Sequence, residues 1–161
     1  MRSEHEVNLA IEKYADMVKR ICFLHLKNEY DTEDIFQNVF IKYLLNDGEF
    51  ESAEHEKAWF ARVTINLCKD FLKSAFRKHT VSIDCLSENT PEVQEEEKRE
   101  ILSAVLSLPA KYKNAVYLHY FEGYTAAEIG KIIGKKENSV YTLLARAREK
   151  LRKILGGDEI E

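Results

Sequence analysis

The sequence predicts an all-α protein made of two small helical domains joined by an acidic linker. Glycine and proline are scarce, with six and two among 161 residues, which disfavours a sandwich of many short strands. Apolar side chains recur three and four residues apart along most of the chain, the spacing of amphipathic helices. Residues 80–97 lose this periodicity, contain Pro91 and turn acidic, as a linker does. We therefore expect domains at residues 1–79 and 98–161.

Three helices are expected in the first domain. The apolar stripe of the first helix consists of Val7, Ala10, Ile11, Tyr14, Val18, Ile21 and Cys22. The second helix is expected to begin with Asp31 as its N-cap. Its apolar stripe consists of Ile35, Phe36, Val39, Phe40, Tyr43 and Leu44. Asn46-Asp47-Gly48 then forms a stop and a turn, and the third helix runs from Ala53 to His79.

The second domain carries the most specific local pattern. Pro109 is expected in the first turn of a helix. Thr125 and Glu128 have the spacing of a capping box, in which each side chain binds the backbone amide of the other residue. We expect Gly130 where another helix approaches closely, and Gly134 where the helix ends at positive φ. The apolar stripe of the last helix consists of Val140, Leu143, Leu144, Ala147, Leu151 and Ile154.

A short capped helix, a glycine turn and a helix rich in Arg and Lys predict a helix-turn-helix that binds duplex DNA. The second helix of such a unit lies in the major groove and leads with its N-terminal residues. The candidates for base contacts are Asn138, Ser139, Tyr141, Thr142 and Ala145. Arg146 and Arg148 are the candidates that face phosphate. The alternative is a plain helical hairpin with a solvated basic face.

The helix after Trp59 has one polar, basic face. At 100° per residue, five of its side chains fall within about 80° of one another: Arg62, Asn66, Lys69, Lys73 and Arg77. The expected apolar side consists of Phe60, Val63, Leu67 and Phe71. Asn66 and Asp70 interrupt the basic residues, so the face combines phosphate contacts with groups that read base edges. Phe50 and Trp59 lie upstream, and exposed rings beside a basic groove bind unpaired bases, although Trp59 at this spacing is more often a core residue.

The net charge of −4 hides a strong charge pattern along the chain. Residues 28–56 contain nine acids and one base, whereas residues 101–155 contain ten bases and four acids. Basic segments suit phosphate, and acidic segments suit a basic protein partner. We interpret part of the acidic region as a docking face for a protein, made of Asp31, Glu33, Asp34, Gln37 and Asn38. The alternatives are capping at a helix N-terminus and ordinary solvated helix faces.

Catalysis, metals and cofactors are not expected. The five histidines form no cluster, and no phosphate-binding loop, dinucleotide fingerprint or nucleophile elbow is present. Cys22, Cys68 and Cys85 are odd in number and far apart, which fits free thiols in a reducing cytoplasm. No apolar run reaches the ~20 residues of a membrane span, and the polar N-terminus does not resemble a signal peptide, so we expect a cytoplasmic protein without membrane insertion.

Three motifs, in order along the chain, resemble those of bacterial sigma factors of the extracytoplasmic-function (ECF) group within the sigma-70 family. Residues 31–40, DTEDIFQNVF, resemble the D-A-E-D-[LI]-x-Q-[DE]-[TV]-F stretch of that group. Trp59, Phe60, Arg62, Val63, Asn66, Asp70 and Lys73 match its W-[LF]-x-[RK]-[IV]-x-x-N-x-x-x-D-x-x-[RK] helix. The C-terminal matches are Leu108-Pro109, Tyr124, Glu128-Ile129-Gly130, Arg146-Ala147-Arg148 and Leu151.

The resemblance implies a protein that gives RNA polymerase core its promoter specificity. Residues 1–79 would correspond to sigma region 2, docking on the β′ clamp helices and opening the −10 element, with a flipped base held by the loop near Phe50. Residues 98–161 would correspond to region 4, which reads the −35 element with its helix-turn-helix. The family further implies contacts with the β subunit, and an anti-sigma factor that masks these surfaces. The alternatives are a stand-alone helix-turn-helix regulator of duplex DNA and an acidic module that sequesters a basic protein.

The chain departs from the family pattern at four positions. Tyr141 and Leu143 stand where Lys and Arg are common, which removes two charges and predicts an altered −35 preference. Lys136 replaces the usual capping Ser, so a later helix start is expected. Asn38 replaces a common acid, which predicts slightly weaker docking on core.

Overall fold

The computed structural model describes residues 1–78 and 96–156, and every regular element in this part of the chain is helical. The chain divides into two compact units, Met1–Thr90 and Pro91–Glu161. The expected linker at residues 80–97 and the end of the third helix at His79 lie outside the described residues, except for residues 96 and 97, which begin a helix. The prediction of an all-α fold is therefore confirmed.

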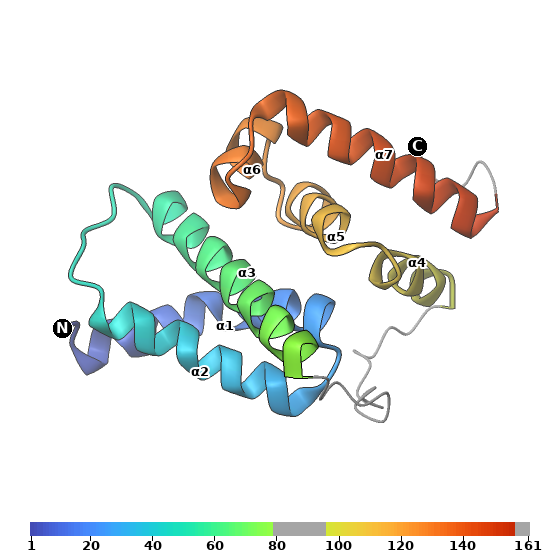
Figure 1. Cartoon of the computed structure of the whole chain (residues 1–161). Coiled ribbons are helices and arrows are strands. Elements are labelled where there is room, and N and C mark those ends of the chain that lie inside the picture. Colours follow the sequence, from blue (N-terminus) through green and yellow to red (C-terminus); the bar gives the residue numbers. More distant parts are fainter. Residues whose placement is uncertain (79–95, 157–161) are drawn as a thin grey trace. The chain divides into compact units, whose positions relative to one another are not determined.

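The N-terminal unit contains three helices, α1 (Glu4–Leu26), α2 (Glu29–Leu45) and α3 (Ala53–Lys78). Each of the three contacts both others, and α3 crosses the pair formed by α1 and α2 (Figure 1). The apolar stripes of α1 and α2 supply most of the buried side chains, as the periodicity predicted. Buried residues of this unit include Ala10, Tyr14, Val18, Ile21, Cys22, Ile35, Val39, Phe40, Tyr43 and Phe60.

The N-terminus of α2 corrects one expectation. Asn28, not Asp31, is the N-cap, because its side-chain oxygen accepts a 2.9 Å hydrogen bond from the backbone amide of Asp31. The helix therefore starts at Glu29. Asp31 lies in the first turn, where a carboxylate interacts favourably with the exposed amides of the helix N-terminus. Asn and Asp are about equally good N-caps, so residue type alone does not distinguish Asn28 from Asp31.

The buried face of α3 also differs from the expected one. Only Phe60 of the predicted apolar side is fully buried, while Val63, Leu67 and Phe71 are half-buried. The face against α1 and α2 instead consists of Phe60, Ala61, Thr64, Ile65 and Cys68. The Thr64 hydroxyl is buried at little cost because it donates to the Phe60 carbonyl at 2.6 Å. This core face therefore combines two large apolar side chains, Phe60 and Ile65, with the smaller Ala61, Thr64 and Cys68.

The C-terminal unit contains α4 (Glu96–Leu106), α5 (Ala110–Val116), a π-helical turn η2 (Tyr117–Phe121), α6 (Ala126–Ile133) and α7 (Glu137–Leu155). Helix α7 contacts α4, α5 and α6 (Figure 1). Its buried residues are Val140, Leu143, Leu144, Ala147 and Leu151, as predicted. Ile154, the last member of the predicted stripe, is instead 51% exposed and lines an open pocket together with Ser103 and Ala104 of α4.

Candidate nucleic-acid interface

The first helix of the predicted helix-turn-helix is fixed by its own side chains. The Thr125 amide donates to Glu128 Oε1 at 2.9 Å, and the Glu128 amide donates to Thr125 Oγ1 at 3.2 Å. Both halves of the predicted capping box are thus present. The hydrogen bond from the Thr125 amide lowers the pKa of the Glu128 carboxyl, which keeps it ionised as the cap requires.

Two glycines shape the turn that follows. Gly134 ends α6 with φ of 71°, the left-handed conformation that was expected. Gly130 is buried, but no other helix explains its small size. A Cβ atom at this position would lie 2.5 Å from the carbonyl oxygen of Lys135, in the backbone of the turn itself. The expected close approach is therefore real, although the partner is the turn rather than a neighbouring helix.

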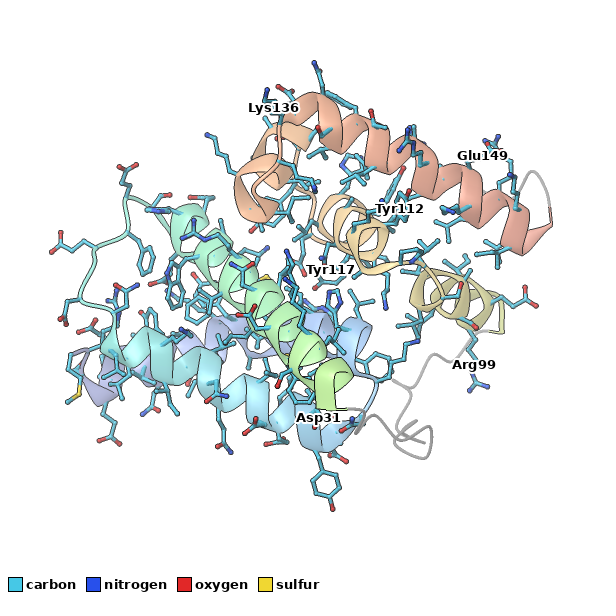
Figure 2. The ribbon with its side chains drawn as sticks, viewed as in Figure 1. Asp31, Arg99, Tyr112, Tyr117, Lys136 and Glu149 are labelled. Atoms are coloured by element: carbon cyan, nitrogen blue, oxygen red, sulfur yellow. The ribbon has the colours of Figure 1, made fainter. Side chains whose placement is uncertain are left out.

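Helix α7 presents the predicted DNA-reading side chains to solvent. Lys136 lies in the turn before it and is its N-cap without a side-chain hydrogen bond, so the helix starts at Glu137 (Figure 2). The exposed candidates are Asn138, Ser139, Tyr141, Thr142, Ala145 and Arg146. Among them Thr142 hydroxyl donates to the Asn138 carbonyl at 3.2 Å, and Tyr141 is 57% exposed. Among the described residues of the C-terminal unit, 96–156, these side chains remain exposed.

Arg148 differs from the other candidates because a second element holds it. It is half-buried, and its Nη1 donates to the hydroxyl of Tyr120 at 3.1 Å. Tyr120 belongs to η2, and both it and Phe121 expose about half of their surface, at 48% and 60%. Sequence analysis missed Tyr120, because no local spacing connects it with α7. This hydrogen bond orients the Arg148 side chain toward η2.

The polar face predicted on α3 is also exposed. Arg62, Asn66, Lys69, Asp70 and Lys73 all lie on the solvent side of the helix, opposite Thr64 and Cys68. The helix continues to Lys78, but the side chain of Arg77 lies outside the described residues. The arrangement therefore brings five of the six predicted α3 residues together on one surface.

The loop before α3 is more ordered than the sequence suggested. Phe50 and Trp59 are both half-buried, and their ring centroids lie 5.8 Å apart. Phe50 also contacts the rings of Tyr43 and His55, at 6.4 and 5.3 Å. The expectation of an exposed ring is corrected for Phe50, which packs on other rings, whereas Trp59 packs against Tyr43 and Phe60 as expected of a core residue, although both stay half-buried.

The carboxylate of Glu56 joins α3 to the other two helices of the unit. Glu56, in the first turn of α3, accepts hydrogen bonds from Tyr14 of α1 at 2.9 Å and Tyr43 of α2 at 3.1 Å. Burial, followed by the hydrogen bond to Glu56, raises the pKa of Tyr43. The three helices therefore meet at one polar point beside the loop. Sequence analysis did not single out Glu56, since it looked like one more acid of an acidic segment.

The predicted docking face on α2 is an exposed acidic surface. Glu33, Asp34, Gln37 and Asn38 are exposed, and Asp31 is half-buried in the first turn, where Asn28 Nδ2 donates to it at 2.5 Å (Figure 2). Apolar side chains of the same helix are exposed as well: Tyr30 (90%), Ile41 (49%) and Leu45 (62%). These three residues were not expected to be exposed, and they lie with the polar residues of α2 rather than in its buried stripe.

Among the described residues, no three His, Cys, Asp or Glu side chains come together in a way that could hold a metal ion. Within the same residues, no helix combines the length and apolar character that crossing a membrane requires. Cys22 and Cys68 are both fully buried free thiols, as predicted, and their sulfur atoms are 4.0 Å apart. Cys85 lies outside the described part of the chain.

Comparison with known proteins gives the family of both units. Residues 10–78 match Sigma-70 region 2, and residues 98–151 match Sigma-70, region 4. The RNA polymerase sigma factor SigV of Bacillus subtilis is 30% identical, covering 83% of this chain and 81% of SigV. The ECF RNA polymerase sigma factor SigW of the same bacterium is 28% identical, covering 90% of this chain and 86% of SigW.

Solved structures agree on the fold. The sigma factor RpoE of Bartonella quintana, crystallised with the anti-sigma factor NepR, superposes with a TM-score of 0.80 at 17% identity, over 96% of this chain and 99% of RpoE. CnrH, solved with the cytosolic domain of CnrY, gives 0.68 at 18% identity, over 95% and 89%. With both sigma regions matched in order and relatives covered over most of their length, this chain belongs to the sigma-70 family of bacterial RNA polymerase sigma factors, in its ECF group.

Proposed function

We propose that this chain acts as an alternative sigma factor in which separate helix faces bind RNA polymerase core and promoter DNA. The observation that carries the proposal is the separation of charge on exposed faces of the two units. The outer face of α2 is acidic, while the outer faces of α3 and α7 carry Arg and Lys beside residues that read bases. A uniformly acidic protein would repel DNA, whereas this arrangement gives each partner a surface of opposite charge.

The proposed docking surface for core consists of Asp31, Glu33, Asp34, Gln37 and Asn38. By family resemblance, its partner is the pair of β′ clamp helices, and further contacts involve the β subunit. Complementary charge speeds association and selects the partner, while apolar contacts contribute most to affinity. The exposed Ile41 and Leu45, on the same helix, supply such apolar area.

The proposed promoter surfaces lie on α3 and α7. For the −10 element they consist of Phe50, Arg62, Asn66, Lys69, Asp70, Lys73 and Arg77. For the −35 element they consist of Asn138, Ser139, Tyr141, Thr142, Ala145, Arg146 and Arg148. Exposed Lys and Arg position the duplex through phosphate, and Asn and Thr side chains read base edges.

Regulation by a protein inhibitor is part of the proposal. RpoE and CnrH, which share this fold, were each solved with a protein bound, and NepR is named as an anti-sigma factor. We propose that an anti-sigma factor covers this chain in the same way. Sigma factors are generally not enzymes, and we propose that this chain acts in the cytoplasm without catalysis or cofactor.

The first test is to mix the purified chain with bacterial RNA polymerase core and separate the mixture by size exclusion. We expect co-elution, and we expect the resulting holoenzyme to select promoter fragments from a random library. Failure to co-elute, together with specific duplex binding by the chain alone, would contradict the proposal and indicate a stand-alone regulator. Duplex binding without core should otherwise be weak, because the chain carries a net charge of −4 and its basic residues are confined to local faces.

Two pairs of substitutions then separate the surfaces of the N-terminal unit. Asn66→Ala with Lys73→Ala is expected to weaken promoter opening several-fold and to leave core binding unchanged. Asp34→Ala with Gln37→Ala is expected to weaken core binding and to leave opening by preassembled holoenzyme unchanged. All four side chains are exposed, so neither pair should affect folding. If both pairs fail at the same step, the proposed division of this unit is wrong.

A further inference from the structure

We infer that Arg2 is a positioning residue for promoter recognition: it holds the loop between α2 and α3 in the shape that presents Phe50. The inference rests on the proposed role of this loop in the −10 contact. Arg2 lies before α1, and the carbonyls that it binds at the end of α2 and in the loop are 41 and 46 residues away in the sequence. Although arginine is usually exposed, its side chain keeps only 13% of its surface accessible.

The guanidinium group of Arg2 donates hydrogen bonds to the end of α2 and to the middle of the loop that follows it. Its Nε donates to the Tyr43 carbonyl at 3.1 Å, in the last turn of α2, and its Nη2 donates to the Gly48 carbonyl at 2.5 Å. Nη1 donates to Glu6 Oε2 at 3.2 Å, which fixes the plane of the group. The Arg2 amide also donates to the Leu44 carbonyl at 2.9 Å. Tyr43 and Leu44 belong to the last turn of α2, whose carbonyls have no partner further along the helix, and the Tyr43 carbonyl also accepts from the Asn46 amide at 3.1 Å.

Aromatic rings complete the contact. The guanidinium carbon lies 4.3 Å from the centroid of the Tyr43 ring and 5.2 Å from that of Phe50. Because the two rings are nearly parallel, at 12°, the cation is in contact with both. Phe50 continues to Trp59 and His55, so Arg2 sits at one end of a chain of rings that reaches α3.

This geometry favours a positioning role over direct binding of DNA. Arg2 directs three nitrogens to protein acceptors and lies against aromatic rings, so little of its charge is available to phosphate. Without such a contact a loop of this length would sample many conformations. Binding of a flipped base would then cost the conformational entropy that is lost when the loop becomes ordered. Because Arg2 orders the loop before the base binds, we expect it to affect selectivity for the flipped base rather than general affinity for DNA.

The first experiment tests the loop in the free protein. Arg2→Ala is expected to speed hydrogen exchange of the amides at residues 46–52 by about tenfold, since charged hydrogen bonds of this kind contribute roughly that factor. Arg2→Lys keeps the charge but lacks the planar fork, so it should behave like the alanine variant. Lys13→Ala removes a charge from an exposed position of α1 and should change nothing in the loop. Unchanged loop exchange in Arg2→Ala would overturn the inference.

The second experiment tests recognition by the holoenzyme. Core saturated with wild-type or variant chain opens fragments from a library randomised at the −10 element, and the opened fragments are sequenced. We expect Arg2→Ala and Arg2→Lys to bind core normally but to lose several-fold of their preference for the selected base. A purely structural defect would weaken core binding as well, and wild-type selectivity in Arg2→Lys would mean that only charge matters; either result overturns the inference.

The two readouts separate this inference from the proposed function. If the wild-type chain fails to bind core or open any fragment, the proposed function fails, and loop exchange still decides whether Arg2 orders the loop. If the wild type opens promoters while loop exchange and base preference are the same in Arg2→Ala, only the inference fails.

Discussion

Helices α3 and α7 both carry basic residues on their outer faces, but different kinds of interaction hold them in place. At α7 the determinants are local: a capping box, a glycine at positive φ and a second glycine beside the turn, all within 13 residues of the helix start. At α3 they are distant, since Glu56, Tyr14 and Tyr43 come from three helices and Arg2 reaches the loop across more than 40 residues. The comparison teaches that two units of one protein can orient similar surfaces by short-range backbone rules or by long-range packing.

The largest effect is expected at Gly130. Gly130→Ala places a Cβ against the Lys135 carbonyl, and because neither backbone can move freely, we expect a loss of about 3 kcal/mol in the C-terminal unit. Gly134→Ala is the matched control: its φ is also unfavourable for alanine, but nothing lies within 4 Å, so only about 1–2 kcal/mol is expected.

Circular dichroism and the fluorescence of Trp59, the chain's single tryptophan, measure this difference during unfolding by urea. Gly130→Ala should shift the part of the circular dichroism transition that belongs to the C-terminal unit and leave the Trp59 transition in place. Equal shifts of both signals would show that the two units do not respond separately, and would break the comparison.

The next largest effect is expected at Glu56, on the other side of the comparison. Glu56→Ala removes the acceptor of two tyrosine hydroxyls, so we expect the N-terminal unit to lose about 2 kcal/mol, seen in the Trp59 transition. Glu54→Ala, at an exposed position two residues earlier in the same first turn of α3, should change stability by less than about 0.5 kcal/mol. Equal effects of the two substitutions would mean that the shared carboxylate does not join the helices.

The third prediction concerns how the stability of the C-terminal unit depends on alkaline pH through Tyr124. Burial, followed by the charges of Glu122 and Glu128, raises the pKa of Tyr124 to about 12 from its ordinary value near 10. Tyr124 therefore keeps its hydroxyl proton to a higher pH in the folded state than in the unfolded state. Its contribution to the free energy of unfolding is present below pH 10 and is lost as the pH rises to 12. The loss reaches about 2–3 kcal/mol at two pH units.

Unfolding of the C-terminal unit between pH 9 and 12 checks this expectation. Tyr124→Phe should unfold with a shallower dependence on pH than the wild type, since both proteins share every other titrating group. Tyr141→Phe, at an exposed tyrosine, serves as the control and should follow the wild type. Parallel curves for Tyr124→Phe and the wild type would exclude Tyr124 as the source of the dependence.

The smallest effect is expected at the capping box. Thr125→Ala removes the acceptor of the Glu128 amide and should cost about 1 kcal/mol in the C-terminal unit. Thr125→Ser keeps the hydroxyl and should retain most of the stability. A serine variant as unstable as the alanine variant would show that the methyl group, and not the cap, is responsible.

Much of the fold could be predicted because its signals lie within a few turns of chain. The apolar stripes of α1, α2 and α7, the capping box at Thr125 and the left-handed turn at Gly134 depend on residues three to ten positions apart. The exposure of the polar faces of α3 and α7 could be predicted for the same reason, since a helix places every third or fourth residue together.

The tertiary structure decided what depends on which helices meet. The core face of α3 includes Thr64 and Cys68 beside Phe60 and Ile65, since the Thr64 hydroxyl bonds to its own helix and the Cys68 sulfur lies 4.0 Å from Cys22 of α1. Val63, Leu67 and Phe71, which the periodicity favoured, stay half-buried. The contacts of Arg2 with Tyr43 and Gly48, and of Tyr120 with Arg148, join residues 28 to 46 positions apart. Sequence periodicity does not predict such pairs, because the residues come into contact and stabilise the fold only once the helices have packed.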